Sequence, residues 1–418
     1  MTMRAPITNW AGNVTFGAAR LHQPDSVDEL RRIVQSSRNV RALGSGHSFS
    51  GVADTTGDLV RLDRLPRTVE IDPVNLTATV GAGMLYAEVA AELHRAGFAL
   101  ANMASLPHIS VAGSCATGTH GSGDTQRSLA ASVAALQLVN ADGDITELSR
   151  EANPATFAGS VVALGALGIV TRLTLDIEAT FEVAQRVRLG VPLDEVAGRF
   201  DEVFGAAYSV SVFTDWRAPD AAVWLKSRID QPEPTWAGGR AARQPVHPIV
   251  GMAADSATEQ LGVAGPWHER LPHFRPELTP GPDKALQSEF YLPRGAAPAA
   301  FAAIRDIGYL VAPVLHIAEI RTVRADDMWL SPAYGRDSVT FHFTWIESLA
   351  PVLPVLAAVA QRLAPLGARP HWGKLTTANP RDIIACYERG DQFAQLAQKY
   401  DPGGKFRNLF VDSLFPVR

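Results

Sequence analysis

Features that mark secreted, membrane-bound or nucleic-acid-binding proteins are scarce in this sequence. Cysteine occurs only at Cys115 and Cys386, and two cysteines cannot form the disulfide framework of a small secreted domain. Residues 1–10 lack the apolar core of a signal peptide, and no uninterrupted apolar run reaches transmembrane length. The formal net charge is only −5, without a run of like charges. We therefore expect a cytoplasmic protein that binds neither nucleic acid nor a membrane.

Familiar short motifs of nucleotide and metal chemistry are incomplete as well. Gly44-Ser45-Gly46 is followed by Phe49 where a dinucleotide fingerprint requires a third glycine. His268-Glu269 and His273 have the spacing H-E-x-x-x-H instead of H-E-x-x-H, and Pro272 interrupts the helix that such a motif needs. We therefore expect no metal site in this segment.

The composition indicates a soluble globular protein with a large core. The chain has 418 residues, of which 46% are apolar and 19% charged. This length suggests about two or three domains. Glycine-rich loops stop near residue 178, where we expect a domain boundary. Residues 401–410 are loop-like again, and we expect them to return to the first domain.

The first part of the chain alternates short strands and helices. Ser26 and Glu29 form a capping-box pattern at the start of an amphipathic helix. Residues 40–43 then read as a strand, and 69–71 with 76–80 read as a hairpin. Asp142-Gly143 is the turn of a second hairpin between 135–139 and 145–148.

Four glycine-rich loops are the most informative feature of this part. They are 44–48, 81–83, 117–123 and 165–170. Small residues allow backbone N–H groups to approach an anion closely. Each loop taken singly is more simply read as a tight turn. Their combination, with histidine and hydroxyl residues interleaved, indicates an extended ligand such as a pyrophosphate.

A second group of polar residues occurs on two expected strands, 315–323 and 338–345. Side chains alternate along a strand, so Glu319 and Arg321 share one face of the first strand. His342 and Thr344 share a face of the second, while 339, 341, 343 and 345 are apolar. If the two strands pair, these four polar residues line one surface. A solvated sheet face with a surface Glu–Arg pair is the alternative.

Several of these segments resemble the vanillyl-alcohol oxidase (PCMH-type) family. Residues 40–48 resemble its flavin-attachment loop, and 111–123 its second pyrophosphate loop. Residues 165–170 resemble its adenosine-side loop, and 401–408 its C-terminal signature. Nearly the whole chain resembles the sugar-alcohol branch of this family, including long strings rich in Trp, His and Pro such as 266–274.

This resemblance implies an α+β protein with a PCMH-type FAD-binding domain and a cap domain built on an antiparallel sheet. The FAD-binding domain would comprise residues 1–178 and the C-terminal return 376–418, with the substrate-binding cap at 179–375. FAD would be bonded covalently through His47 as an 8α-histidyl flavin. The other implied cofactor-binding residues are Ala42, Leu43, Gly44, Ser45, Gly46, Ser48, Ser105, Ser110, Gly113, Thr117, Gly118, Thr119, His120, Ile169, Val170 and His342.

The resemblance also implies the reaction. A monomeric FAD-dependent oxidase would convert the terminal primary alcohol of alditols such as xylitol and sorbitol to the aldose, while O2 is reduced to hydrogen peroxide. An aldonolactone oxidase or dehydrogenase of the same family is the nearer alternative, and a non-enzymatic or metal-dependent hydrolytic protein the farther one.

Ala104 is a candidate for oxygen access beside the flavin. The implied substrate-binding residues are Ser105, Glu319, Arg321, Thr344 and Lys374, and the implied catalytic residues are His342, Lys374 and Arg321, with the base being either His342 or Lys374.

Overall fold

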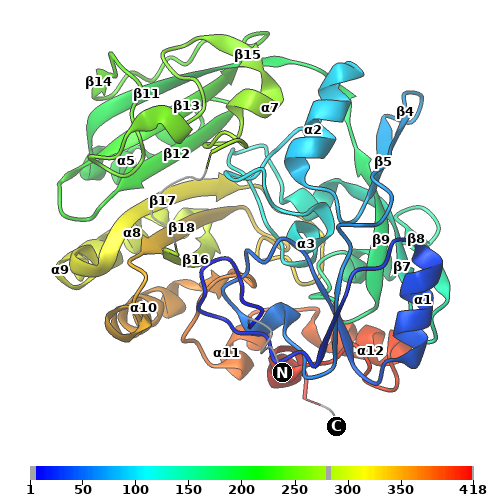
Figure 1. The fold of residues 1–418 in the computed structure, drawn as a ribbon. Helices are drawn as coiled ribbons and strands as arrows, with labels where there is room; N and C mark the ends of the chain where they lie inside the picture. Colours follow the sequence, from blue (N-terminus) through cyan, green and yellow to red (C-terminus); the bar gives the residue numbers. More distant parts are fainter. Residues whose placement is uncertain (1–5, 279–283, 417–418) are drawn as a thin grey trace.

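The computed structural model describes residues 6–278 and 284–416. The expectation about residues 1–10, that they lack the core of a signal peptide, therefore concerns in part residues 1–5, which lie outside the described residues. Two sheet-based halves make up the molecule (Figure 1). Strands from residues 20–176 form one half, and the second half is built on a large antiparallel sheet.

The first half begins with a small parallel sheet in the order β1-β3-β2. The side chain of Ser26 accepts a hydrogen bond from the Glu29 backbone N–H and caps α1. The Glu29 carboxylate accepts from the Asp25 N–H instead of the Ser26 N–H, so only half of the predicted capping box forms. The elements are β1 (Arg20–His22), α1 (Val27–Ser36), β2 (Val40–Leu43) and β3 (Asp58–Arg61).

A five-stranded antiparallel sheet follows, in the order β4-β5-β9-β7-β8. Both predicted hairpins are confirmed, as β4 with β5 and β7 with β8. A two-stranded ribbon pairs β6 with β10. The elements are β4 (Val69–Asp72), β5 (Thr77–Gly81), α2 (Tyr86–Arg95), β6 (Phe98–Ala99), α3 (Val111–Ala116), β7 (Val133–Val139), β8 (Ile145–Ser149), α4 (Phe157–Ser160), β9 (Ile169–Asp176) and β10 (Glu178–Ala179).

The second half is a nine-stranded sheet in the order β14-β11-β13-β12-β17-β18-β16-β19, with β15 paired to β11. Its strands are β11 (Glu182–Pro192), β12 (Ser209–Thr214), β13 (Asp220–Arg228), β14 (Arg240–Ala241), β15 (Ala264–Pro266), β16 (Leu286–Pro293), β17 (Leu315–Val323), β18 (Ser338–Trp345) and β19 (Arg369–Pro370). Its helices are α5 (Leu193–Gly198), α6 (Phe200–Phe204), α7 (Trp267–Arg270), α8 (Ala297–Arg305), α9 (Gly308–Val311) and α10 (Leu349–Leu363).

The alternation predicted for 338–345 is confirmed in β18. Val339, Phe341, Phe343 and Trp345 are fully buried in the core of the second half. Because successive side chains of a strand face opposite sides, His342 and Thr344 lie on the other face of the sheet. That face is turned toward the first half of the molecule and carries the site described below.

The chain after residue 375 lies against the first half. Its helices are α11 (Pro380–Ala385), α12 (Gly390–Tyr400) and α13 (Leu409–Leu414). The backbone N–H of Val40 donates to the carbonyl of Lys405, and Asn408 Nδ2 donates to the carbonyls of Gly51, Val52 and Asp54. The expectation of a loop over 401–410 was wrong at its end, because Asn408 caps α13 and Phe410 is helical.

The cores of the two halves interlock. Trp267, Trp329 and Trp372, all from the stretch 179–375, belong to the hydrophobic cluster of the first half. The boundaries near 178 and 375 stay a prediction.

By length and composition alone, the described segment 349–366 could span a membrane. It contains Pro354, and its fully buried residues, Val352, Leu356, Val359 and Leu363, pack in the core of the second half.

Candidate active site

One continuous cavity lies where the two halves meet. Its walls come from the glycine-rich loops of the first half, from β16, β17 and β18, and from residues 371–374. Most of the residues predicted to bind cofactor or substrate therefore share one space. Those that line it are Ala42, Leu43, Gly44, Ser45, Gly46, His47, Ser48, Ala104, Ser105, Ser110, Gly113, Thr117, Thr119, His120, Val170, Glu319, Arg321, His342, Thr344 and Lys374.

Two predicted cofactor residues are not part of this lining. Gly118 has a positive φ of 71°, and its carbonyl accepts a hydrogen bond from the Tyr291 hydroxyl at 3.1 Å. Ile169 is buried and pairs with Val139 in the five-stranded sheet. Both residues hold their loops through these backbone contacts and do not line the cavity. Their neighbours Thr117, Thr119 and Val170 do line it.

The loops around Gly44 and Gly113 are packed so closely that any side chain at either position would force Ser110 to move. A Cβ atom on Gly44 would collide with the Ser110 hydroxyl, and one on Gly113 would lie 2.7 Å from the same oxygen. The backbone N–H of Ser110 donates to Ser45 Oγ at 3.2 Å, which joins the two loops. Small side chains leave the backbone of both loops open to a ligand, which is the property expected of a cradle for pyrophosphate.

Arg41 holds the segments around this cradle together. Its guanidinium is buried and donates to the carbonyls of Val52, Leu164, Gly165 and Phe406. These carbonyls belong to segments that are far apart in the sequence. Burial lowers the pKa of Arg41 to about 10, and nearby Asp401 acts in the opposite direction. The guanidinium is therefore charged at neutral pH, and a fixed positive charge lies beside the glycine-rich loops.

His47 lies at the cavity wall beside Trp10. The two rings are stacked, with centroids 5.6 Å apart and planes inclined by 22°. Burial, followed by the charges of Lys374 and His108, lowers the pKa of His47 to about 4. The imidazole is therefore neutral near pH 7 and has a free nitrogen lone pair, which nucleophilic attack requires.

The opposite wall is a polar row across three adjacent strands. His342 of β18 is in register with Glu289 of β16 on one side and with Glu319 of β17 on the other. Arg321 and Thr344 lie on the same face at neighbouring positions. The predicted pairing of 315–323 with 338–345 is confirmed. The alternative of a solvated face is wrong, since Glu319 and Arg321 are each only 5% exposed.

Arg321 contacts acidic residues on both sides. Its Nη2 donates to Glu289 Oε1 at 2.7 Å, and its Nε lies 3.5 Å from Glu319 Oε1. Its Nη1 reaches Ser105 Oγ at 3.4 Å. Burial disfavours the charged guanidinium, but Glu319 and Glu289 raise the pKa of Arg321 above its ordinary value. The cation is thus held permanently at the centre of the polar row.

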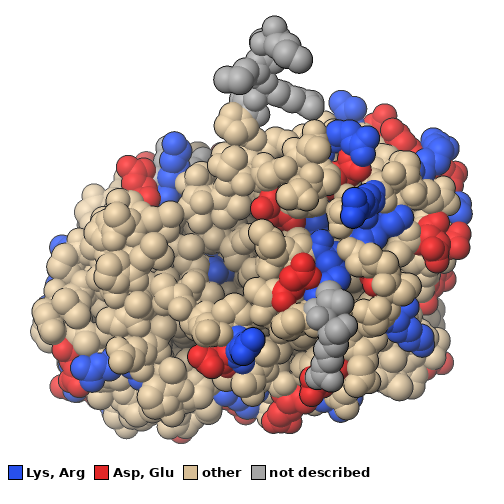
Figure 2. All heavy atoms as spheres, turned by 90° about the horizontal axis from the view of Figure 1, so that it is seen from below, with Lys and Arg blue, Asp and Glu red and all other residues tan. Residues whose placement is uncertain are grey.

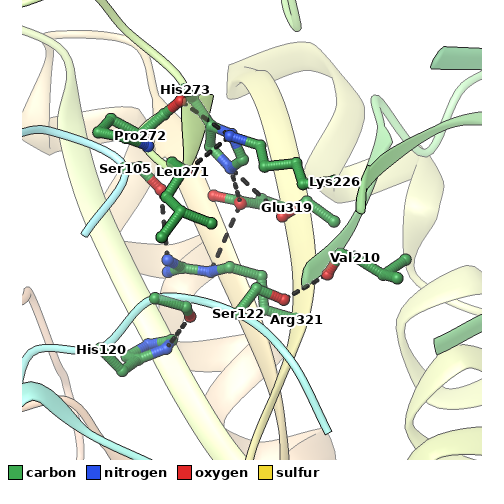
Figure 3. Close-up of polar contacts among 12 residues, drawn as sticks. Ser105, His120, Ser122, Val210, Lys226, Leu271, Pro272, His273, Glu319 and Arg321 are labelled. Atoms are coloured by element: carbon green, nitrogen blue, oxygen red, sulfur yellow. Dashed lines mark hydrogen bonds and ion pairs between the residues drawn. The ribbon is translucent and has the colours of Figure 1, made fainter. Parts of the chain in front are cut away.

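Sequence reasoning missed Glu289 and the contact of His273 with the polar row. Glu289 Oε1 also contacts His120 Nε2 at 2.9 Å, and Glu319 Oε1 contacts His273 Nε2 at 2.7 Å. Figure 3 shows His120 and His273 on opposite sides of Arg321. The run Gln287-Ser288-Glu289 precedes apolar residues in the strand 286–293, and this carboxylate at the edge of an apolar run could have drawn attention to Glu289. Only the fold brings His273 to the row, because its local sequence suggested nothing but an incomplete metal motif.

Lys374 and His342 differ in charge near neutral pH. Lys374 Nζ donates to Gln287 Oε1 and lies 5.2 Å from the centre of the Phe49 ring. Burial lowers the pKa of Lys374 to about 8, so the ammonium form dominates at pH 7. Burial also lowers the pKa of His342 to about 3, so its imidazole is neutral and able to accept a proton.

The structure offers no alternative centre of metal chemistry in the residues it describes. Among residues 6–278 and 284–416, no group of three or more His, Cys, Asp and Glu side chains could hold a metal ion. His268 and His273 diverge: the ring of His268 packs against Trp267, while His273 contacts Glu319. On the face seen in Figure 2, basic and acidic side chains are interspersed among many uncharged residues.

Comparison with known proteins matches two stretches of the chain to family models. The family of FAD binding domains matches residues 18–149, and the D-arabinono-1,4-lactone oxidase family matches residues 284–414. An alditol oxidase from a Streptomyces species is 48% identical over 416 residues, covering 99% of both chains. An L-gulonolactone oxidase from Scyliorhinus torazame is 26% identical, also over 99% of both chains. Among solved structures, a cholesterol oxidase from B. sterolicum has a TM-score of 0.78 at 16% identity, with 98% of this chain and 96% of that chain covered, which is a likeness of fold.

Proposed function

Because this chain belongs to the vanillyl-alcohol oxidase family of FAD-binding flavoproteins, in the branch that includes alditol oxidase, we propose that it oxidises the terminal primary alcohol of an alditol to the aldose. FAD bound in the cradle would supply the two-electron acceptor for the hydride of the carbinol carbon, with O2 as the final oxidant. One alditol and one O2 thus give one aldose and one hydrogen peroxide. The observation that carries this proposal is the single cavity in which the glycine-rich cradle faces the row of Glu289, His342 and Glu319.

The polar wall suits a neutral substrate that consists of hydroxyl groups. Such a ligand needs several hydrogen-bond donors and acceptors, because an unmatched buried polar group costs about 1–3 kcal/mol. Carboxylate, guanidinium, ammonium and hydroxyl groups line the same cavity. We assign substrate binding to Ser105, Glu319, Arg321, Thr344 and Lys374.

Proton transfer is assigned by the charge of each side chain. Neutral His342 takes the hydroxyl proton, because its pKa of about 3 leaves the imidazole unprotonated. Lys374, with a pKa of about 8, and Arg321 remain cationic near neutral pH. These two cations stabilise the developing alkoxide. Of the two candidate bases, His342 and Lys374, we therefore favour His342 as part of the proposal.

We also propose that His47 holds the flavin covalently. Forming the bond would remove one hydrogen from the imidazole and one from the C8 methyl group of the flavin, and O2 would take up both hydrogens with their electrons to give hydrogen peroxide. The lowered pKa of His47, about 4, supplies the neutral nucleophile. Acid-precipitated protein should stay yellow, and the peptide that contains His47 should gain the mass of FAD. A colourless pellet would contradict the attachment.

An aldonolactone substrate is the second candidate. It is favoured by the match of residues 284–414 to the D-arabinono-1,4-lactone oxidase family. The 48% identity to an alditol oxidase, against 26% to an L-gulonolactone oxidase, supports the alditol. A peroxide assay against xylitol, sorbitol, aldonolactones and aldoses decides between them. A lactone preference above about tenfold in kcat/KM, or about 1.4 kcal/mol in the transition state, would transfer the chain to the lactone branch.

The remaining expectations belong to the same proposal. We propose a monomeric cytoplasmic enzyme with an FAD-binding domain of residues 1–178 and 376–418 and a cap of residues 179–375. Sedimentation in the presence of substrate tests the monomer, and limited proteolysis tests the domain boundaries.

A further inference from the structure

The segment that follows α7 contacts two of the proposed substrate-binding residues at once. The backbone N–H of His273 donates to the carbonyl of Ser105 at 3.1 Å. The side chain of the same residue contacts Glu319 Oε1 at 2.7 Å through Nε2. Ser105 belongs to a loop of the first half, while Glu319 lies on β17. His273 therefore connects the two walls of the cavity.

The surroundings of the His273 ring determine which nitrogen carries its proton. Nδ1 is buried and has no hydrogen-bond partner among the described residues, and the ring lies edge-on to Phe213 and Trp224. A proton on Nδ1 would be unsatisfied there, and the Nε2 lone pair would face a carboxylate oxygen. The Nε2–H tautomer avoids both costs. Burial lowers the pKa of His273 to about 4, so the ring remains a neutral donor at physiological pH.

Lys226 holds this segment in place. It lies on β13, is 1% exposed, and donates to the carbonyls of Arg270, Leu271 and Pro272 at 2.8, 2.6 and 2.8 Å. An ammonium group has three donors, and all three are used on three consecutive carbonyls. Figure 3 shows the lysine beside Glu319, with its nitrogen directed at this segment. A buried lysine whose hydrogen bonds within the described residues are all to this segment serves to fix the backbone that presents His273.

Glu319 depends on this arrangement because Arg321 is engaged elsewhere. The short contact of Arg321 is with Glu289, at 2.7 Å, while its Nε lies 3.5 Å from Glu319. The hydrogen bond from His273 is thus the short charge-assisted contact that Glu319 makes within the described residues. Its direction fixes the rotation of the carboxylate in the cavity.

We propose that His273 is a positioning residue, which orients Glu319 and Ser105 toward the substrate hydroxyls and is itself held by Lys226. This inference rests on the proposed function of the same site. It assigns a function to the segment 270–273 that goes beyond binding of the substrate itself. The ring of His273 acts through Glu319, and its backbone acts through Ser105.

The test compares His273→Phe, which keeps a flat ring without a donor, with His273→Gln, whose amide can donate to Glu319. His273→Phe should raise KM for xylitol roughly tenfold to a hundredfold, since hydrogen bonds to charged groups are strong. The limiting rate of anaerobic flavin reduction should change less than about threefold. His273→Gln should recover most of the affinity. His268→Phe, on the same segment but outside the cavity lining, is the matched control and should leave KM unchanged.

A pH profile separates positioning from simple structural damage. The groups that face Glu319 are Arg321 on its own strand, His342, His273, Lys226 and Lys374. They hold the pKa of Glu319 below its ordinary value despite burial. Without the His273 donor, the acid limb of kcat/KM should move to higher pH, whereas His273→Gln and His268→Phe should keep the wild-type limb. The ¹⁵N spectrum of histidine-labelled wild type should also show one Nε2–H tautomer that disappears in His273→Phe.

The outcomes are distinct. An unchanged KM and acid limb in folded His273→Phe would overturn the positioning role. A wild-type protein that oxidises no alditol would instead overturn the proposed function, while the ¹⁵N signal would still report the His273 tautomer. If His273→Phe does not fold, His273→Asn serves, because its shorter amide cannot reach Glu319. It should show the same rise in KM, and wild-type affinity in His273→Asn would overturn the inference.

Discussion

At the scale of single residues, the two cations of the polar wall have different surroundings and therefore different chemistry. Arg321 is fixed between two carboxylates and is charged at any relevant pH. Lys374 contacts the neutral side chain of Gln287 and has a pKa lowered to about 8. Only the lysine can lose its charge near the working pH of an enzyme, so it is the more informative residue to change.

Replacing Lys374 by methionine deletes the charge and keeps the aliphatic bulk. Loss of a preorganised donor at a developing alkoxide typically costs about 10²–10³ in rate. Lys374→Met should therefore slow anaerobic flavin reduction by that factor, while reoxidation by O2 changes much less. Rapid-mixing measurements separate the two half-reactions. Lys399→Met, at an exposed position of α12, is the control. Flavin reduction at the wild-type rate in Lys374→Met would show that this lysine is a bystander.

The pH dependence of wild-type flavin reduction tests the assignment of base and cation. Lys374 is protonated below its pKa of about 8 and loses its proton above it. If the ammonium stabilises the alkoxide, the reduction rate should fall as the pH rises through about 8. If neutral Lys374 were the base instead, the rate would rise over the same range. His342, with a pKa of about 3, contributes no change there.

Glu289 should matter for both stability and substrate binding. Its Oε1 accepts from Arg321 and from His120, and the residue is 1% exposed. Breaking a buried ion pair by removing one partner costs about 3–5 kcal/mol. Glu289→Gln should lower the free energy of unfolding by about that amount in urea. Glu259→Gln, which loses only an exposed pair with Arg275, should cost about 0–1 kcal/mol.

The pH dependence of the Glu289 contribution has a definite sign. Although burial opposes ionisation, Arg321 and His120 hold the pKa of Glu289 well below its ordinary value. A carboxyl with a lowered folded-state pKa stabilises the protein above its unfolded pKa, near 4.3, and this stabilisation is lost as the pH falls toward the folded value. The gap in stability between wild type and Glu289→Gln should therefore narrow below about pH 4.3. A gap that is constant with pH would contradict the ionised pair.

At the scale of secondary-structure elements, the C-terminal segment closes the first half of the molecule. Asn408 donates to three carbonyls of residues 51–54, and its Oδ1 accepts from the Val411 N–H to cap α13. Asn408→Ala leaves these carbonyls without a side-chain donor and removes the cap, at a cost of about 1–3 kcal/mol. Thermal unfolding should show the loss. Asn379→Ala removes only the exposed cap of α11, and an equal loss in both variants would show that the three carbonyls contribute little.

The elements that sequence predicts best are those with a local signal. Residues 338–345 alternate strictly between polar and apolar, and 315–323 place Glu319 and Arg321 two positions apart, so the facing of Glu319 and of His342 within their strands follows from the two-residue period. The strand 286–293 follows a proline-rich loop and was not predicted, so Glu289 was missed. His273 was missed for a different reason: its partner Glu319 is 46 residues away. Contacts of that kind depend on which strands pair, and no local pattern contains this information.

At the scale of the whole molecule, the cavity joins the two cores. Its lining includes Gly44 and Gly113 of the first half and Glu289 and Lys374 of the second. A ligand that fills it contacts both halves only when they are folded and docked. Binding energy at this interface therefore becomes stability of the whole native state. How strongly the cofactor contributes depends on whether it can dissociate, which the proposed bond to His47 would prevent.

If the flavin is covalent in the wild-type protein, as proposed, it stays attached when the chain unfolds, and added FAD should not change the midpoint of thermal unfolding. His47→Ala should hold FAD reversibly. Its free energy of unfolding should then rise by about 1.4 kcal/mol for each tenfold increase in free FAD above the dissociation constant, because only the folded state binds. Calorimetry over a range of FAD concentrations measures this slope, and His108→Ala, which removes a histidine outside the cavity lining, should behave as wild type. If the midpoint of His47→Ala is independent of FAD while its acid precipitate stays yellow, the flavin is attached elsewhere. If wild type itself shows the slope, the cofactor is held without a covalent bond, and the glycine-rich loops and Arg41 must supply the whole of its binding.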